Sequence, residues 1–373
     1  MKTYNLYGVF DIPHIGYGRM VTSMRDTLAK YVSFDELSEA AIYAVPPDMV
    51  KGWYDGQRTA CLTMWETDLV PERYTRTLRM FDTVIVPCEH NRELFGPFHP
   101  DIKVIPLGID HDWWHPVEVA DNDRFRFITG GSGWKRKGIQ QIIDAFKQLN
   151  LPDSELFIKC TPDLLDDPKS YEFGANVTVV KERMTVEQER DFYATADCFI
   201  SATRGEGFGM IPLQNLALGN RVIAPAHTGH LWFSHLFDYP LDWEWGQASM
   251  QYFREVGNWC VPDNQQLLDA MRDAYNKGRP PLWERQQRFE NTLQFTWDNC
   301  ALELMRVFPP GGTIKQGDWL DAGGRKIKVR ALKTAVCDVG QYHLKLVKDQ
   351  ETYVPISTIM HLYECGLVTE IAE

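Results

Sequence analysis

The sequence predicts an α/β protein with two Rossmann-like units, residues 1–112 and 113–275, and a small β-rich appendage. Short apolar runs alternate with helical patterns through the first unit, and the alternation repeats in the second. The first unit has about the usual size of a Rossmann-like domain. After Pro309-Pro310-Gly311-Gly312 the chain changes to short strand-like runs separated by glycine turns, so 310–373 is assigned to the appendage.

The first unit is expected to begin with a strand, a glycine turn and a helix. The expected strands are Tyr4–Phe10, Ala40–Val45, Thr59–Trp65, Thr83–Pro87 and Val104–Leu107. The expected helices run from the Gly16–Gly18 turn to Leu28 and over Pro71–Met80.

The second unit shows the same order of elements. The expected strands are Phe125–Ile128, Glu155–Lys159, Val177–Val180, Asp197–Ser201 and Arg221–Ala224. The expected helices are Gly138–Leu149, Val186–Ala196, Pro212–Leu218, Gln265–Asn276 and Leu282–Val307. In the appendage, short strands are expected at Trp319-Leu320, Lys326–Leu332, Tyr342–Val347 and Thr352–Ile356.

Composition excludes several classes of protein. No apolar run reaches the roughly 18 residues of a membrane span, and the first residues lack the apolar core of a signal peptide. The eight cysteines show no CxxC spacing, which favours reduced thiols in a cytoplasmic protein. The net charge of −12 argues against a global nucleic-acid-binding field but leaves a local basic surface open.

A glycine-rich turn followed by two cations is the first candidate phosphate site. In GGSGWKRKGIQQIIDAF, which begins at Gly130 and includes Gly133, a strand leads into a glycine turn. Arg136 and Lys137 lie where the following helix begins. Helix N-termini hold anions, and two cations there are unfavourable unless an anion lies between them. The pattern predicts a diphosphate site; the alternative is a solvated basic turn.

A second turn of this kind is RGEGFGMIPLQ, residues 204–214. Glu206 follows a strand, at the edge where open α/β sheets place ligands. Gly207 and Gly209 permit close approach of a ligand to the backbone. Two such turns suit a ligand with phosphates at one end and hydroxyls at the other, although an ordinary tight turn is the alternative.

Several motifs in the right order resemble a known family. The run ERMTVEQERDFYATADCFISATRGEGFGMIPLQNLALGNRVIAPAHTG is similar to the retaining nucleotide-sugar glycosyltransferases of family four, which have the GT-B fold. GGSGWKRKGIQQIIDAFKQL, TVIVPCEHNRELF, IKVIPLGIDHDWWHP and FTWDNCALELMRVF extend the resemblance over about residues 1–308. It implies an acceptor domain at 1–112 and a donor domain at 113–275 that face a cleft. Residues 276–309 would be helices that cross back to the first domain.

The resemblance also implies roles for individual residues. Arg136 and Lys137 would bind the donor diphosphate and neutralise the leaving nucleotide, a stabilisation that can replace a metal. Glu206, with the backbone of Gly207, Phe208 and Gly209, would orient the hydroxyls of the donor sugar. The full set of expected donor-binding residues is Gly16, Gly18, Gly133, Gly207, Phe208, Gly209, Gln214 and His227.

The sequence departs from the family at two positions. The second acid of the family's pair is here Gln214, which keeps an acceptor for the ribose but loses a charge-assisted hydrogen bond. In place of a histidine after the third strand of the first domain, the chain reads CLTMWETDLVP. Glu66 is therefore the candidate acceptor-side catalytic residue, against a helix-cap role for Glu66 or Asp68.

Histidines supply the remaining candidates. His227 and His230 follow a donor-domain strand in a loop that faces the cleft in the family, and His14 precedes Gly16. His111 and His115 have HxxxH spacing but no third ligand nearby, so neither a metal site nor another cofactor is expected.

The sequence thus predicts a cytoplasmic, retaining glycosyltransferase that uses a nucleotide-diphosphate sugar and an acceptor hydroxyl on a saccharide, lipid-linked compound, protein or nucleic acid. One alternative is modification of hydroxymethylated bases in viral DNA. This alternative rests on the segment GGRKIKVRALK (323–333), which is interpreted as a basic hairpin that could bind nucleic acid. The alternative for this hairpin is an ordinary solvated surface. A second alternative for the chain is an inactive subunit that binds a nucleotide sugar, suggested by Gln214.

Overall fold

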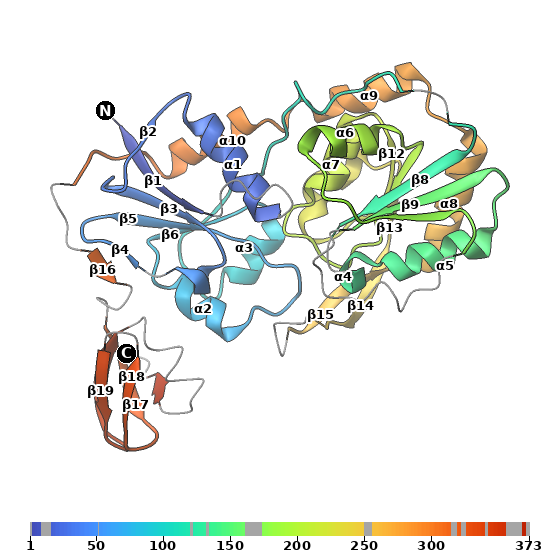
Figure 1. Cartoon of the computed structure of the whole chain (residues 1–373). Coiled ribbons are helices and arrows are strands. Elements are labelled where there is room, and N and C mark those ends of the chain that lie inside the picture. The colour runs from blue at the N-terminus through green and yellow to red at the C-terminus, as the bar shows by residue number, and fades with distance from the viewer. Residues whose placement is uncertain are drawn as a thin grey trace.

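Two six-stranded parallel sheets, side by side, form the body of the chain (Figure 1). The computed structural model describes residues 2–8, 16–50, 52–119, 122–131, 134–160, 174–249, 256–314, 319–321, 326–339, 342–355 and 368–370. Helices accompany both sheets, so the predicted α/β class is confirmed. None of the helices in these ranges is long and apolar enough to cross a membrane.

The first sheet has the order β2-β1-β3-β5-β6-β7. Its strands are β1 (Thr3–Gly8), β2 (Ser33–Phe34), β3 (Ala40–Ala44), β5 (Arg58–Leu62), β6 (Thr83–Val86) and β7 (Ile102–Val104). The accompanying helices are α1 (Gly16–Leu28), α2 (Glu72–Leu78) and α3 (Glu89–Phe95). The inner strands β3 and β6 are buried along their whole length, as expected for parallel strands covered on both faces.

The second sheet has the order β10-β9-β8-β11-β12-β13. Its strands are β8 (Phe125–Gly130), β9 (Ser154–Lys159), β10 (Val177–Val180), β11 (Cys198–Ile200), β12 (Arg221–Pro225) and β13 (Tyr239–Leu241). The strand order reverses between β8 and β11, and ligands of open α/β sheets bind at the carboxyl ends of the strands at such a point. Both predicted glycine turns leave the sheet there, one after β8 and one after β11.

The helices of the second sheet place these turns. They are α4 (Trp134–Lys137), α5 (Ile139–Leu149), α6 (Val186–Ala194), α7 (Met210–Ala217), α8 (Asn264–Lys277) and α9 (Leu282–Thr292). An antiparallel pair, β14 (Trp243–Gln247) and β15 (Asn258–Pro262), is added beside them. α7 begins directly at the Glu206 turn, and α4 holds the two predicted phosphate-binding cations.

The expected single helix over 282–307 is wrong, because the chain forms α9 and then α10 (Trp297–Val307). Thr296 caps α10 by accepting a hydrogen bond from the backbone N–H of Asn299 at 3.0 Å. Ile109 donates its backbone N–H to Phe295 at 2.9 Å, so the break lies beside the other connection between the sheets. α10 packs on α1, which brings the chain back to the first sheet (Figure 1).

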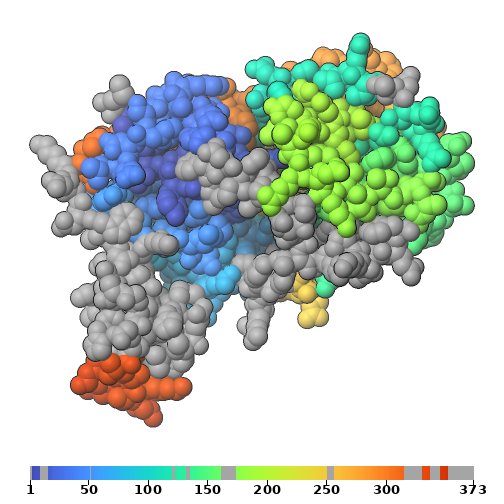
Figure 2. Space-filling model, viewed as in Figure 1, coloured from blue at the N-terminus to red at the C-terminus, as the bar shows by residue number. Residues whose placement is uncertain are grey.

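The appendage is joined to the first unit by strand pairing. Thr3 bridges Gly311, Ser38 bridges Thr313, and β16 (Trp319–Asp321) pairs with β4 (Gly52–Tyr54). Beyond it, β17 (Lys326–Ala331) lies between β20 (Glu351–Pro355) and β21 (Val368–Glu370), while β18 (Ala335–Val339) pairs with β19 (Tyr342–Leu346). The predicted basic hairpin is therefore wrong for 326–331, which form the central strand of a three-stranded sheet; 323–325 lie outside the described residues. In Figure 2 the described part of this appendage lies far from the second sheet.

Candidate active site between the two sheets

Glycines let the two turns of the second sheet pack against each other. Gly138, with φ of 64°, caps α5, and a Cβ on it would lie 2.1 Å from the carbonyl oxygen of Ala202. Gly209, with φ of 101°, caps α7 in the left-handed region that favours glycine. The backbone N–H of Arg204 donates to the carbonyl of Arg136 at 2.7 Å, which ties one turn to the other.

Arg136, Lys137 and Glu206 form a charged cluster in this place. The Lys137 ammonium pairs with one oxygen of Glu206, and Arg136 Nη1 lies 3.5 Å from the other. Arg136 also donates to the backbone carbonyl of Gly205 at 2.6 Å. Burial alone would raise the pKa of the Glu206 carboxyl, but the Lys137 and Arg136 cations outweigh it and hold this pKa well below its usual range. Glu206 therefore stays ionised and acts as an acceptor of hydrogen bonds.

Residues of the first sheet close over this cluster. Glu66 lies 3.8 Å from Arg136 Nη1, which brings a first-domain carboxylate to the cations of the second sheet's turn. A Cβ on Gly205 would lie 2.0 Å from the carbonyl oxygen of Glu66, and one on Gly207 would lie 2.1 Å from Met64 Sδ. Asp68 accepts hydrogen bonds from the backbone and side-chain amides of Asn258 at 2.5 and 3.0 Å. The two domains are thus in close contact around Glu206.

A cavity of about 310 Å³ remains between the domains at this point, within the size range of small-molecule sites. Of the predicted residues it is lined by Gly16, Glu66, Arg136, Lys137, Glu206, Gly207, Phe208, Gly209 and Gln214. Phe208 is almost completely buried and packs on Phe233 with ring centroids 5.5 Å apart. The roles expected for these residues remain predictions, but the structure brings the residues together.

Gln214 reaches the cavity from the second turn of α7. Its side chain is 5% exposed, and its Oε1 has no hydrogen-bond partner among the described residues. Gln214 also lines an adjoining cavity of about 220 Å³, where the buried Nε1 of Trp113 likewise has no partner in the described part of the chain. A buried polar atom without a partner is costly, so this end of the cleft is suited to a hydroxyl-bearing ligand.

Two predicted donor-binding positions among the described residues, Gly18 and His227, do not line the cavity. Gly133 and His14 lie outside the described residues. Gly18 is buried within α1. His227 is fully buried, with Nε2 2.8 Å from the carbonyl of Thr203 and Nδ1 3.0 Å from Thr228 Oγ1. Its ring supports the loop behind the Glu206 turn, because Thr228 Oγ1 accepts the backbone N–H of Glu206 at 3.0 Å.

His230 is buried in the same loop behind the Glu206 turn, and it also does not line the cavity. Its Nδ1 lies 2.9 Å from the carbonyl of Pro225, and a Cβ on Gly209 would lie 2.3 Å from its Cδ2. Elsewhere, His111 Nε2 lies 3.1 Å from Thr292 Oγ1, and His115 Nδ1 lies 3.1 Å from the carbonyl of Pro116. Within the described ranges, no group of three or more His, Cys, Asp or Glu residues is arranged to hold a metal ion.

The prediction missed three charged residues that line the same cavity, namely Arg19 of α1, Lys159 at the end of β9 and Glu189 of α6. Lys159 could have been found, because it ends a strand of the sheet at the ligand-binding edge. Arg19 and Glu189 gave no local signal, because charged residues on amphipathic helices are usually exposed.

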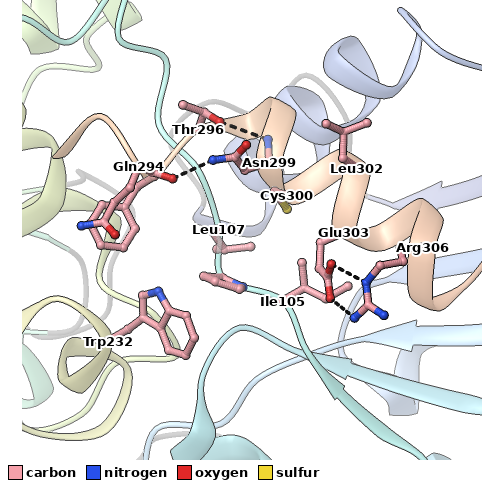
Figure 3. A pocket seen from close by; sticks show the side chains of 12 residues that line it. Ile105, Leu107, Trp232, Gln294, Thr296, Asn299, Cys300, Leu302, Glu303 and Arg306 are labelled. Atoms are coloured by element: carbon pink, nitrogen blue, oxygen red, sulfur yellow. Dashed lines mark hydrogen bonds and ion pairs between the residues drawn. The ribbon is translucent and has the colours of Figure 1, made fainter.

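A larger groove, of about 500 Å³, is lined in part by residues 105–107 of the inter-domain connection. Figure 3 shows Trp232 on one side of this groove and Glu303 and Arg306 of α10 on the other, with Ile105 and Leu107 of the connection between them. None of the predicted site residues lines it. The chemistry-bearing residues are therefore in the smaller cavity at the strand ends.

Comparison with known proteins agrees with this geometry. The model of the family described as glycosyl transferases group 1 matches residues 110–231. That segment contains Arg136, Lys137, Glu206 and Gln214. No curated protein matches the chain.

Solved structures share the fold at low sequence identity. Sucrose-phosphate synthase from Thermosynechococcus elongatus is 17% identical over 68% of this chain and 67% of that one, with a TM-score of 0.50. WaaG, a glycosyltransferase involved in lipopolysaccharide biosynthesis, is 14% identical over 83% and 100% of the two chains, with a TM-score of 0.56. Anabaena HepE, solved with UDP and glucose, is 11% identical over 82% and 99%, with a TM-score of 0.56.

The match to the glycosyl transferases group 1 model and the shared GT-B fold identify a glycosyltransferase, as the sequence resemblance predicted. The segment that matches the glycosyl transferases group 1 model includes the turns that carry the charged cluster.

Proposed function

We propose that this glycosyltransferase moves a sugar from a nucleotide-diphosphate donor to an acceptor hydroxyl, with retention of the anomeric configuration. The observation that carries the proposal is the cluster of Arg136, Lys137 and Glu206 at the start of α7, within the cavity between the domains. Catalysis of such a transfer depends on stabilising a leaving diphosphate, and preorganised cations in a closed site supply that stabilisation.

Arg136 and Lys137 would bind the diphosphate. Both side chains are at most 19% exposed, so little water has to be removed from them when an anion enters. In the donor-free protein Glu206 and Glu66 balance their charge. A diphosphate would take over part of this pairing, and the helix N-terminus at Gly209 and Met210 would add favourable dipoles.

Glu206 would accept hydrogen bonds from the hydroxyls of the donor sugar. It remains ionised between the two cations, which suits an acceptor and not a proton donor. The close approach of Gly205 and Gly207 to the first domain leaves the backbone of this turn directly at the cavity wall. Glu66, on the opposite wall, is the group available to the acceptor side.

Gln214 would hold the nucleotide ribose. Its unpartnered Oε1 needs a donor, and a ribose hydroxyl supplies one. The amide NH₂ of the same side chain can donate in return. A nucleotide lying from Gln214 towards Lys137 would place its phosphates at the start of α7.

The proposed transfer takes place on one face of the sugar. The bond from the anomeric carbon to the donor phosphate oxygen breaks, and the acceptor oxygen bonds to the same carbon from the same side. The acceptor proton passes to an oxygen of the departing phosphate, so a nucleoside diphosphate and a glycoside are the products. Arg136 and Lys137 stabilise the negative charge that develops on the phosphate as it leaves.

A donor panel tests this function. The protein is incubated with UDP-, GDP- and ADP-sugars and with saccharide, lipid-linked and hydroxymethylated-DNA acceptors, and mass spectrometry detects released nucleotide and glycosylated product. We expect turnover with one donor class and its loss in Glu206→Ala. If the protein binds a nucleotide sugar but neither hydrolyses nor transfers it with any acceptor, the transferase is replaced by a nucleotide-sugar-binding subunit. An α-linked product from an α-linked donor, by NMR, establishes retention.

A further inference from the structure

A second charged cluster lies at the Gln214 end of the cavity. Glu189, in the first turn of α6, is only 2% exposed. One of its carboxylate oxygens accepts from Lys159 Nζ at 2.6 Å, and the other is paired with the guanidinium of Arg19. Arg19 belongs to α1 of the first domain, whereas Lys159 and Glu189 belong to the donor side, so the cluster joins the two domains.

The position of Arg19 shows which end of the donor this cluster would meet. Arg19, Met210 and Gln214 line both the main cavity and the adjoining smaller cavity. Lys137 and Glu206 line only the main cavity. Arg19 therefore lies towards the ribose-binding end proposed for Gln214, and the first cluster lies towards the sugar.

Stability alone gives no reason for such a cluster. A buried ion pair is often no more stabilising than apolar residues of the same volume, because desolvation offsets the attraction between the charges. Here both cations line the cavity beside the single carboxylate, so an anion that enters the cavity would meet the two of them together. A phosphate has several acceptor oxygens and could share these cations with Glu189.

We propose that Arg19 and Lys159 bind the ribose-linked phosphate of the donor, and that Glu189 is a positioning residue that holds these two cations in place before the donor enters. The inference rests on the proposed function, because it assigns a phosphate of the same nucleotide donor. Since one cation comes from each domain, binding of this phosphate also stabilises the contact between the domains. In the bound state Glu189 competes with the phosphate for the same cations.

This arrangement predicts effects of opposite sign. Arg19→Gln and Lys159→Gln each lose a charged contact and should weaken binding of the nucleoside diphosphate about tenfold. Glu189→Gln removes a competing negative charge and should tighten it by a similar factor, although it should lower the melting temperature of the donor-free protein. Binding of the uncharged nucleoside should stay unchanged in all three variants.

Calorimetric titration of the full chain tests these signs. Each variant is titrated with nucleoside diphosphate, nucleoside and inorganic pyrophosphate, after thermal unfolding shows that it is folded. Glu155→Gln is the matched control, because it breaks the Arg126–Glu155 pair, 2.7 Å long, outside the cavity. It should change none of these affinities. Arg19→Lys keeps the charge, should retain most of the affinity, and replaces Arg19→Gln if that variant does not fold.

The outcomes separate this inference from the proposed function. The anion site is present if wild type binds pyrophosphate and this affinity falls in Lys159→Gln and rises in Glu189→Gln. If no nucleotide binds in the same experiments, the result counts against the proposed function and not against the anion site. If wild type binds the diphosphate and all variants match Glu155→Gln, Arg19, Lys159 and Glu189 only support the structure. A loss of affinity in Glu189→Gln would overturn the assigned competition.

Discussion

Close contact between the domains at Gly205 gives the most direct test of the closed site. A Cβ added to Gly205 would lie 2.0 Å from the backbone carbonyl oxygen of Glu66, and 3.0 Å from its carbonyl carbon. Backbone cannot move aside as a flexible side chain can, so Gly205→Ala should hold the domains apart by about 1 Å, given that Cβ contacts below roughly 3 Å do not persist. A displacement of about 1 Å in a catalytic site can cost on the order of 100-fold in rate.

We therefore expect Gly205→Ala to lower kcat/KM about 100-fold, equivalent to roughly 2.7 kcal/mol in the transition state, while its melting temperature stays near that of wild type. Steady-state kinetics with the donor found in the panel measures kcat/KM. Small-angle scattering reports whether the domains separate. Gly312→Ala is the matched control, because its Cβ would meet only the Glu39 carboxylate at 3.6–3.7 Å, far from the cavity. Wild-type kcat/KM in Gly205→Ala would refute the idea that this closed contact is the active arrangement.

Four further predictions address charge and ligand. Arg136→Ala and Lys137→Ala should each weaken nucleotide-sugar binding by about 1 kcal/mol or more, measured by calorimetry; unchanged affinity would mean that the phosphate site lies elsewhere. Gln214→Glu should weaken binding of the nucleoside diphosphate, and unchanged affinity and rate would show that position 214 is not adapted to this donor. Turnover should persist in EDTA, since the cations bind the leaving diphosphate. The pKa of His227 is about 3 because burial and His230 disfavour its protonated form, so the unfolded chain binds the proton first. The free energy of unfolding should then fall by roughly 1.4 kcal/mol per pH unit below about pH 6.5, and His227→Asn should flatten this slope in urea titrations.

The sequence predicts the sheets well because their strands are covered on both faces. Such strands appear as nearly continuous apolar runs, and the buried strands Ala40–Ala44 and Thr83–Val86 lie within the expected Ala40–Val45 and Thr83–Pro87. The break between α9 and α10 could not be read in this way, because Leu293 and Phe295 continue the apolar pattern. It is set by the contact of Phe295 with Ile109, more than 180 residues away in the chain.

The candidate site likewise contains some residues that local sequence identifies and others that only the tertiary structure brings together. Arg136, Lys137 and Glu206 follow glycine turns at strand ends, so local sequence identifies them. Arg19 and Glu189 come together only because α1 and α6 meet across the cleft, a contact that no local pattern contains. For His227 the sequence predicted a contact with the ligand that the structure does not provide. Its loop lies next to the site, but its ring contacts the carbonyl of Thr203 and does not line the cavity.

The charges around the cavity suggest a reason for a neutral side chain at position 214, where the family has an acid. Among the described residues, four cations line the cavity, and three carboxylates oppose them: Arg19, Arg136, Lys137 and Lys159 against Glu66, Glu189 and Glu206. With Gln at 214 the wall keeps one net positive charge, whereas a Glu there would cancel it. In the proposed donor complex the amide would give up a charge-assisted hydrogen bond to the ribose, but it would remove a repulsion from the phosphates. Because Glu189 already supplies a carboxylate at this end, a second acid would compete with the proposed donor for Arg19, whereas the neutral side chain would favour entry of a diphosphate.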